Sequence, residues 1–294
     1  MAKHTLENGK LRIQVDEKGA ELTALYDLES DTALLWDGNP DFWAKHSPVL
    51  FPIVGALRHN RYTHKGSSYF LSRHGFARDR EFTLVDTDES SLLFRLEADE
   101  DTLRMYPFKF TLDIRYTITG KELTVSYEVW NNGKEAMYFS LGAHPAFRIP
   151  WFPGTEYNDY YLDFGSKITV ERWPLSSDGL IREKSEPFIQ NKSVLKLDKS
   201  LFSSDALVFK SFPGNKIAVR SEKVAVSFEV EWDKNFRYLG LWAAPGADFL
   251  CIEPWCGIAD GINADGELKN KEGIIKLEKE QLFNAAWTVR VLTD

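Results

Sequence analysis

The strongest constraint on the fold is a strict alternation of apolar and polar residues over short runs. Apolar side chains recur at every second position in residues 11–15, 111–118, 123–129, 216–220, 224–230 and 238–242. Because successive side chains on a strand point to opposite faces, this period predicts strands with one buried face. Residues 119–122 separate two of these runs and predict a hairpin connection.

The same pattern predicts the architecture. Turn-forming pairs such as Asn8-Gly9 and Asn132-Gly133 punctuate the chain, and we identify no helix longer than a few turns and no linker. We therefore expect residues 1–294 to form a single all-β domain, a large antiparallel β-sandwich of roughly twenty short strands. Aromatic residues make up 14% of the chain. They exceed the needs of a core and favour a stacking surface for a ring-shaped ligand.

Charge and motif content exclude several functional classes. A net charge of −8 with no cationic stripe argues against nucleic-acid binding. The N-terminus lacks the apolar segment of a secretory signal, and no apolar stretch is long enough to span a membrane. We expect a cytoplasmic protein with no membrane partner. No phosphate-binding loop, dinucleotide motif or GxSxG motif is present.

Three residues stand out as candidates for chemistry. His74 lies in a turn-like segment rich in cations, and His144 precedes Pro145, which places it at a strand end or loop mouth. Glu253 closes an apolar run beside Trp255, so partial desolvation would raise its pKa and make it a better proton acceptor. Packing in the core remains an alternative for each histidine, and pairing with an arginine remains one for Glu253.

Metal binding is a further possibility for these three side chains. Two histidines and a glutamate can form a ligand set, but their wide separation matches no metal-binding motif. Cys251 and Cys256 lack the spacing of a zinc knuckle or redox pair and are expected to pack in the core. We therefore expect no metal and no other cofactor.

Taken in order, four segments resemble the aldose 1-epimerase (galactose mutarotase-like) family. They are residues 55–62, 73–79, 142–147 and 252–255, and they include the HGFAR, HPAF and IEPW motifs of a bacterial branch. The resemblance covers nearly the whole chain. It implies a large antiparallel β-supersandwich and a cofactor-free isomerase that interconverts the α and β anomers of a hexose.

The resemblance also implies roles for individual residues. His144 corresponds to the general acid that protonates the ring oxygen, Glu253 to the general base at the anomeric hydroxyl, and His74 to a second active-site histidine. Asn60 and Arg61 match a substrate-binding pair. The remaining candidates for contact with the sugar are Asp205, matched to a hydroxyl-anchoring aspartate, and the aromatic residues Trp242, Trp255 and Phe147, for which core packing is the alternative.

One departure from the family leaves the substrate open. Ala56 stands where many relatives carry arginine, and Arg58 or Arg61 could replace that cation. Some relatives act on hexose 6-phosphates, for which the available arginines are Arg58, Arg73, Arg78 and Arg80. These arginines could bind a phosphate or form a solvated rim.

Other functional classes also stay open. They are a non-catalytic sugar-binding module, a metal-dependent enzyme and a retaining glycosidase, which would need a second carboxylate near Glu253. The expected partner is a small-molecule sugar, and the chain is expected to be a monomer or homodimer.

Overall fold

A computed structural model describes residues 2–293 and confirms the all-β prediction. These residues form 21 strands, five short 3-10 helices and one α-helix, α1 (Glu100–Met105). The 3-10 helices are η1 (Arg58–Asn60), η2 (Ala77–Asp79), η3 (Tyr157–Asp159), η4 (Lys199–Phe202) and η5 (Leu268–Asn270). Within this part of the chain, no helix is long and apolar enough to cross a membrane.

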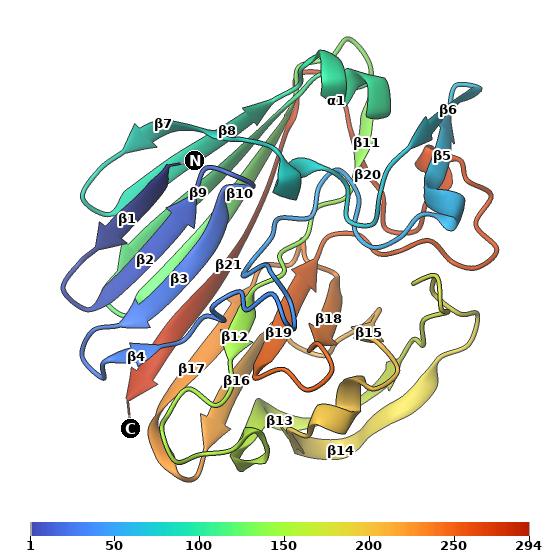
Figure 1. The fold of residues 1–294 in the computed structure, drawn as a ribbon. Helices are drawn as coiled ribbons and strands as arrows, with labels where there is room; N and C mark the ends of the chain where they lie inside the picture. The colour runs from blue at the N-terminus through green and yellow to red at the C-terminus, as the bar shows by residue number, and fades with distance from the viewer. Residues whose placement is uncertain (1, 294) are drawn as a thin grey trace.

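The largest element is a nine-stranded antiparallel sheet, drawn as the back layer in Figure 1. In spatial order its strands are β14 (Glu186–Lys196), β13 (Tyr160–Arg172), β16 (Lys216–Ser221), β17 (Val224–Trp232), β21 (Leu282–Thr293), β10 (Glu122–Asn131), β9 (Phe110–Thr119), β8 (Ser91–Glu97) and β7 (Thr83–Thr87). The predicted hairpin is confirmed, because β9 and β10 pair in the register Glu122↔Thr119 around Gly120 and Lys121.

Two four-stranded antiparallel sheets lie in front of this layer (Figure 1). The first contains β1 (Lys3–Glu7), β2 (Leu11–Asp16), β3 (Glu21–Asp27) and β4 (Thr32–Ala33). The second contains β12 (Ala146–Arg148), β19 (Phe249–Trp255), β18 (Tyr238–Trp242) and β15 (Leu207–Phe209). Two short pairs complete the fold: β11 (Met137–Phe139) with β20 (Ile275–Leu277), and β5 (Arg61–His64) with β6 (Ser67–Phe70).

Aromatic side chains join the layers. The rings of Phe147 in β12 and Phe228 in β17 lie 4.6 Å apart, which ties the second small sheet to the large one. Tyr116 in β9 donates a hydrogen bond of 2.6 Å to the carbonyl of Ala20, which directly precedes β3. This bond ties the first small sheet to the half of the nine-stranded sheet that contains β9. Alternation therefore has the predicted consequence: one face of each layer enters a common apolar core.

A tight backbone contact holds two loops together at the edge of the second small sheet. Gly75 has φ +73°, and a Cβ placed on it would lie 2.3 Å from the carbonyl oxygen of Phe51. The amides of Phe76 and Ala77 both donate to that same carbonyl, at 3.0 and 3.1 Å. Only glycine permits this approach, because the contact is to backbone that cannot rotate away.

We predict that Gly75→Ala destabilises the protein far more than Gly66→Ala. Both glycines have positive φ, but a Cβ at Gly66 in the β5–β6 turn meets nothing within 4 Å. Backbone strain alone should cost about 1–2 kcal/mol at each position, and the collision with Phe51 should add roughly 1–3 kcal/mol at Gly75. Urea unfolding of the two variants measures the difference, and equal losses would show that the Gly75 contact is unimportant.

Candidate functional site

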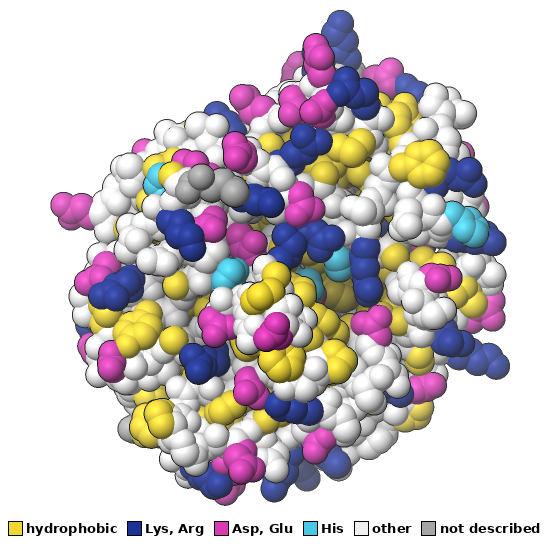
Figure 2. Space-filling view, in the orientation of Figure 1, with side chains coloured by type: hydrophobic (Ala, Val, Ile, Leu, Met, Phe, Trp, Pro, Cys, Tyr) yellow, Lys and Arg dark blue, Asp and Glu magenta, His cyan; other side chains and the backbone are white. Residues whose placement is uncertain are grey.

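A cavity of about 310 Å³ opens at the edge of the second small sheet. Figure 2 shows a hollow near the middle of this face, with histidine side chains inside and Lys or Arg side chains at its border. The lining residues are Trp43, Gly55, Arg73, His74, Arg78, His144, Leu175, Gly179, Ile181, Asp205, Ala206, Val208, Trp242, Glu253, Trp255, Ile258 and Ala259. All three residues singled out for chemistry are therefore brought together.

Strand β19 supplies Glu253 through the alternation of its side chains. Glu253 and Trp255 both line the cavity, and Phe249 on the same face packs against Trp242 at 5.6 Å. Because β19 lies between β12 and β18, its backbone is hydrogen-bonded on both sides. Glu253 is thus a fully buried carboxyl group, 1% exposed, on a rigid central strand.

His144 lies in the short connection between β11 and β12, as its proline neighbour predicted. The amide of Leu50 donates to the carbonyl of Gly142 at 2.9 Å, and the amide of Gly142 donates back to the carbonyl of Leu50 at 3.0 Å. The amide of Ala143 donates to the carbonyl of Pro254. On the C-terminal side of His144, the amide of Ala146 donates to the backbone carbonyl of His46. The segment is held on both sides, which fixes the imidazole against Glu253.

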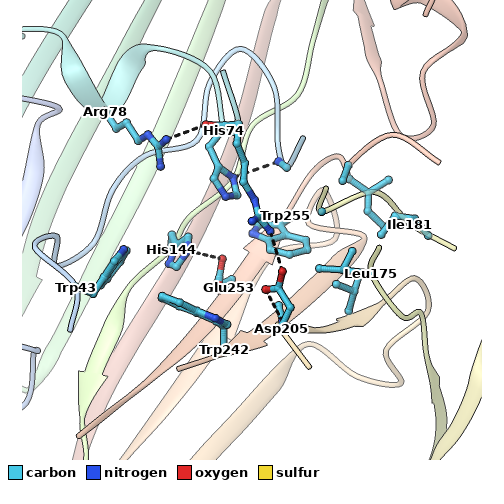
Figure 3. Close-up of a pocket in the computed structure, with 17 residues that line it drawn as sticks. Trp43, His74, Arg78, His144, Leu175, Ile181, Asp205, Trp242, Glu253 and Trp255 are labelled. Carbon is cyan, nitrogen blue, oxygen red and sulfur yellow. Dashed lines mark hydrogen bonds and ion pairs between the residues drawn. The ribbon is translucent and has the colours of Figure 1, made fainter. Parts of the chain in front are cut away.

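The imidazole and the carboxyl form the centre of the site (Figure 3). Nε2 of His144 lies 3.2 Å from Oε2 of Glu253. Burial raises the pKa of Glu253 well above its ordinary value, against the opposing effect of Arg73. Burial also lowers the pKa of His144 to about 3. Both shifts favour uncharged groups, so burial favours the form in which the pair carries one proton, on Glu253 rather than on His144.

His74 is held in a specific tautomer. Its backbone amide donates to the carbonyl of Gly55 at 2.9 Å, while the amide of Gly55 donates to Nδ1 of His74 at 3.1 Å. Burial, assisted by His144 and nearby arginines, lowers the pKa of His74 well below its usual value, so the ring is neutral. With Nδ1 accepting, Nε2 carries the proton, and His74 can offer a hydrogen-bond donor.

Three tryptophans form the aromatic walls. The ring of Trp43 stacks on His144 with centroids 5.0 Å apart and an interplanar angle of 27°. Trp242 meets the same imidazole edge-on at 5.7 Å and 85°. Trp255 fits beside Gly240, where a Cβ would lie 2.5 Å from the indole. The cavity therefore offers flat apolar surfaces beside its polar groups, an arrangement suited to a sugar ring.

Two arginines and one aspartate supply the remaining charge. Arg73 lies 3.6 Å from Oδ2 of Asp205, and the Asp205 backbone adopts a left-handed φ of 77°. Arg78 donates to the carbonyl of Arg73 at 2.8 Å, while its buried Nε has no hydrogen-bond partner among the described residues. The opposite wall is apolar and includes Leu175 and Ile181 (Figure 3).

Several predicted contact residues do not reach the cavity. His59 and Asn60, in η1, have left-handed φ values of 61° and 53°, and Arg61 then begins β5. Both Asn60 and Arg61 are exposed. Phe147 is fully buried and packs on Phe228, so the core-packing alternative is correct for it. The structure thus brings Arg78, Asp205, Trp242 and Trp255 to the cavity, but neither Asn60 nor Arg61.

The arginines near Ala56 also point elsewhere. Ala56 is buried and does not line the cavity, and Arg58 donates to the carbonyl of Ala264. Arg80 lies 3.7 Å from Asp101, outside the lining. The cations of the site are therefore Arg73 and Arg78, which flank the HGFA segment.

Sequence reasoning missed Trp43 and the apolar wall from the β13–β14 connection. Trp43 lies in a segment without periodicity, and its partner His144 is about a hundred residues away in the chain. The only local signal was the density of aromatic residues in Trp36, Phe42 and Trp43 outside a strand. Leu175 and Ile181 were equally hidden, since they read as ordinary loop residues.

The described residues contain one group of side chains whose donors could hold a metal ion. It consists of His144, Cys251 and Glu253, whose ligand atoms all lie within 4.8 Å of one another. His74, included in the set considered from sequence, is not part of this group. Both cysteines are free and buried, as expected from their spacing.

Comparison with known proteins gives a consistent result. Residues 2–276 match the family described as aldose 1-epimerase. Protein LacX (chromosomal) of Lactococcus lactis subsp. lactis is 33% identical over 297 residues, which cover 98% of this chain and 98% of that protein.

Solved structures share the fold over its full length. A galactose mutarotase related enzyme from Lactobacillus acidophilus superposes with a TM-score of 0.93 at 33% identity, covering 100% of this chain and 99% of the other. A galactose mutarotase-like protein from Lactobacillus casei gives 0.92 at 27% identity, with coverage of 99% and 100%. These likenesses confirm the predicted supersandwich architecture.

The lowered pKa of His74 predicts an acid-sensitive contribution to stability. The unfolded chain binds a proton at this residue below about pH 6.5 while the folded site does not, so stability falls as the pH falls. His74→Asn removes the titration but keeps an acceptor for Gly55 and suits the left-handed φ of 70°. Between pH 7 and 5, wild type should lose about 2 kcal/mol more unfolding free energy than His74→Asn. Urea unfolding at both pH values checks this, and parallel losses would contradict it.

Proposed function

Because this chain belongs to the aldose 1-epimerase family, we propose that it interconverts the α and β anomers of a free aldohexose bound in the cavity. The observation that carries the proposal is the His144–Glu253 pair. Its two proton-transfer atoms lie 3.2 Å apart, both groups are buried, and both line the cavity. Anomer exchange requires two proton transfers at neighbouring oxygens, O1 and O5, and a close acid–base pair suits that task.

The proton balance follows from the single mobile proton of the pair. In ring opening, Glu253 as carboxylate takes the proton of O1, the C1–O5 bond breaks, C1=O1 forms, and O5 takes a proton from His144. This step leaves Glu253 protonated and His144 neutral. After rotation about C1–C2, the two transfers run backwards and close the ring on the other face of C1.

Burial favours the pair with Glu253 protonated and His144 neutral, which is the form that ring opening leaves behind. The raised pKa of Glu253 and the lowered pKa of His144 favour Glu253 as the holder of the proton in the absence of sugar. The carboxylate–imidazolium form needed for ring opening is reached by moving that proton across 3.2 Å. Starting from the uncharged form instead would exchange the roles of the two residues. In both cases Glu253 and His144 are the catalytic residues.

The other lining residues bind and orient. The Nε2–H of His74 can donate to a ring or hydroxyl oxygen, since its Nδ1 is occupied by Gly55. Asp205 and Arg73, paired at 3.6 Å, can accept from and donate to hydroxyls. Trp242 and Trp255 offer apolar faces to the C–H groups of the ring.

A hexose 6-phosphate is the second candidate substrate, and one observation favours it. Two arginines line the cavity, and the buried Nε of Arg78 makes no hydrogen bond within residues 2–293, with Oδ2 of Asp79 lying 3.7 Å away. A phosphate would satisfy such a donor through a charge-assisted hydrogen bond.

Arg78→Met should then abolish activity on the phosphate ester, whereas Arg80→Met, which changes an arginine outside the cavity, should not.

We predict that the protein accelerates anomer exchange and that Glu253→Gln slows it by on the order of 10²–10⁴-fold, because the amide cannot take a proton from O1. Exchange spectroscopy by NMR at pH 7, with galactose, glucose and glucose 6-phosphate, measures the rate. Glu278→Gln serves as the matched control, since Glu278 is exposed and pairs with Lys276.

The outcomes separate the functional classes. Exchange on a free sugar that is lost in Glu253→Gln supports the leading proposal. Exchange on glucose 6-phosphate alone supports the second. Sugar binding without acceleration in either protein would overturn both and identify a binding module.

The pKa shifts also predict the shape of the pH profile. The pair keeps its single proton from just above the lowered pKa of His144, about 3, up to the raised pKa of Glu253. The value of kcat/KM should therefore stay level through the mildly acidic range and fall only at higher pH, where the pair loses this proton. An acidic decline centred near pH 6.5 would show that His144 titrates normally and would contradict the assignment.

A further inference from the structure

A thiol lies beside the acid–base pair and takes no part in the proposed reaction. Cys251 precedes Glu253 by two residues in β19 and pairs in register with Ala146 of β12, two residues after His144. Side chains two apart on a strand share a face, so the thiol lies on the Glu253 side of β19. The nitrogen, sulfur and oxygen donors of His144, Cys251 and Glu253 lie within 4.8 Å of one another.

One donor of the group lacks a hydrogen-bond partner, and another has only one polar contact within the group. Among the described residues, Nδ1 of His144 has no partner, and Oε2 of Glu253 has only the 3.2 Å contact with Nε2 of His144, although the side chains are only 7% and 1% exposed. Buried polar atoms without partners are rare and often mark a ligand site. Both residues line the cavity, which gives a small ion a route to the group.

We propose that His144, Cys251 and Glu253 form a binding site for a thiophilic divalent cation of the Zn²⁺ type, which blocks the acid–base pair when bound. On binding, Cys251 and Glu253 release their protons to water, and His144 contributes a lone pair. The three protein ligands leave a fourth position open to the cavity. The binding site is independent of the sugar reaction, whereas the inhibition rests on the proposed function.

The spacing of the donors can be compared with that of a Zn²⁺ site. Zn²⁺ bonds of about 2.0–2.3 Å in a tetrahedral arrangement place donors roughly 3.3–3.7 Å apart. Nε2 of His144 and Oε2 of Glu253 already lie 3.2 Å apart. The sulfur of Cys251 lies within 4.8 Å of both other donors, and rotation about its single side-chain torsion would adjust that distance. A mixed N, S, O donor set selects Zn²⁺ over Mg²⁺ and Ca²⁺, which prefer oxygen ligands alone.

Cobalt substitution tests the site directly. Co²⁺ added to the reduced, purified protein should produce a thiolate-to-cobalt charge-transfer band in the near ultraviolet, and Zn²⁺ should displace it. The band should be absent in Cys251→Ala and in the volume-conserving Cys251→Ser, with folding checked by circular dichroism. It should persist in Cys256→Ala, the matched control, because Cys256 is the other buried free cysteine and is not part of the group.

Inhibition provides a second readout. Zn²⁺, but not Mg²⁺, should stop anomer exchange by the wild type, and Cys251→Ala should need roughly tenfold more Zn²⁺ for the same fractional inhibition. Absence of a thiolate band in wild type, or its loss only in Cys256→Ala, would overturn the site. If the protein accelerates no exchange, the cobalt spectrum still decides the question, so failure of the site and failure of the proposed function are distinguishable.

Discussion

The removal of two ionisable groups from water governs the properties of this site. Charge on an isolated buried carboxylate or imidazolium is costly, so burial favours the uncharged forms of Glu253 and His144. Nε2 of His144 and Oε2 of Glu253 lie 3.2 Å apart, close enough for the direct proton transfer that we propose. Such a pair is suited to the proton exchange that the proposed reaction requires.

The fold creates this burial by converging loops onto a rigid strand. Glu253 lies on β19, which is hydrogen-bonded on both sides, while the His144 segment is pinned by backbone bonds to Leu50 and Pro254. The reciprocal bonds between Gly55 and His74 then set the tautomer of a third ring. Backbone contacts, which cannot change rotamer, therefore hold the segments that carry all three candidate side chains.

The cavity is chemically two-sided. Arg73 and Asp205 offer charged hydrogen-bonding groups, while Leu175 and Ile181 form an apolar wall and Trp242 a flat one. A sugar ring has the same duality, with hydroxyl groups at its edge and C–H groups on its faces. The two arginines and the donor set of His144, Cys251 and Glu253 are separate features: the former bear on the proposed substrate, and the latter bears on the proposed metal ion.

Local sequence pattern determined the strands and the candidate catalytic side chains. The β9–β10 hairpin follows from alternation and a short turn, and Glu253 and His144 stood out through their immediate neighbours Trp255 and Pro145. Such signals depend on a few adjacent residues, so they survive without knowledge of the fold.

Only the tertiary structure decided what surrounds those side chains. Trp43 stacks on His144 across a long separation, and a left-handed turn carries Asn60 and Arg61 away from the cavity. Cys251 reads in sequence as a core residue, and its place beside the acid–base pair depends on the pairing of β12 with β19. Contacts between distant segments arise from sheet register and loop convergence, which local periodicity does not encode.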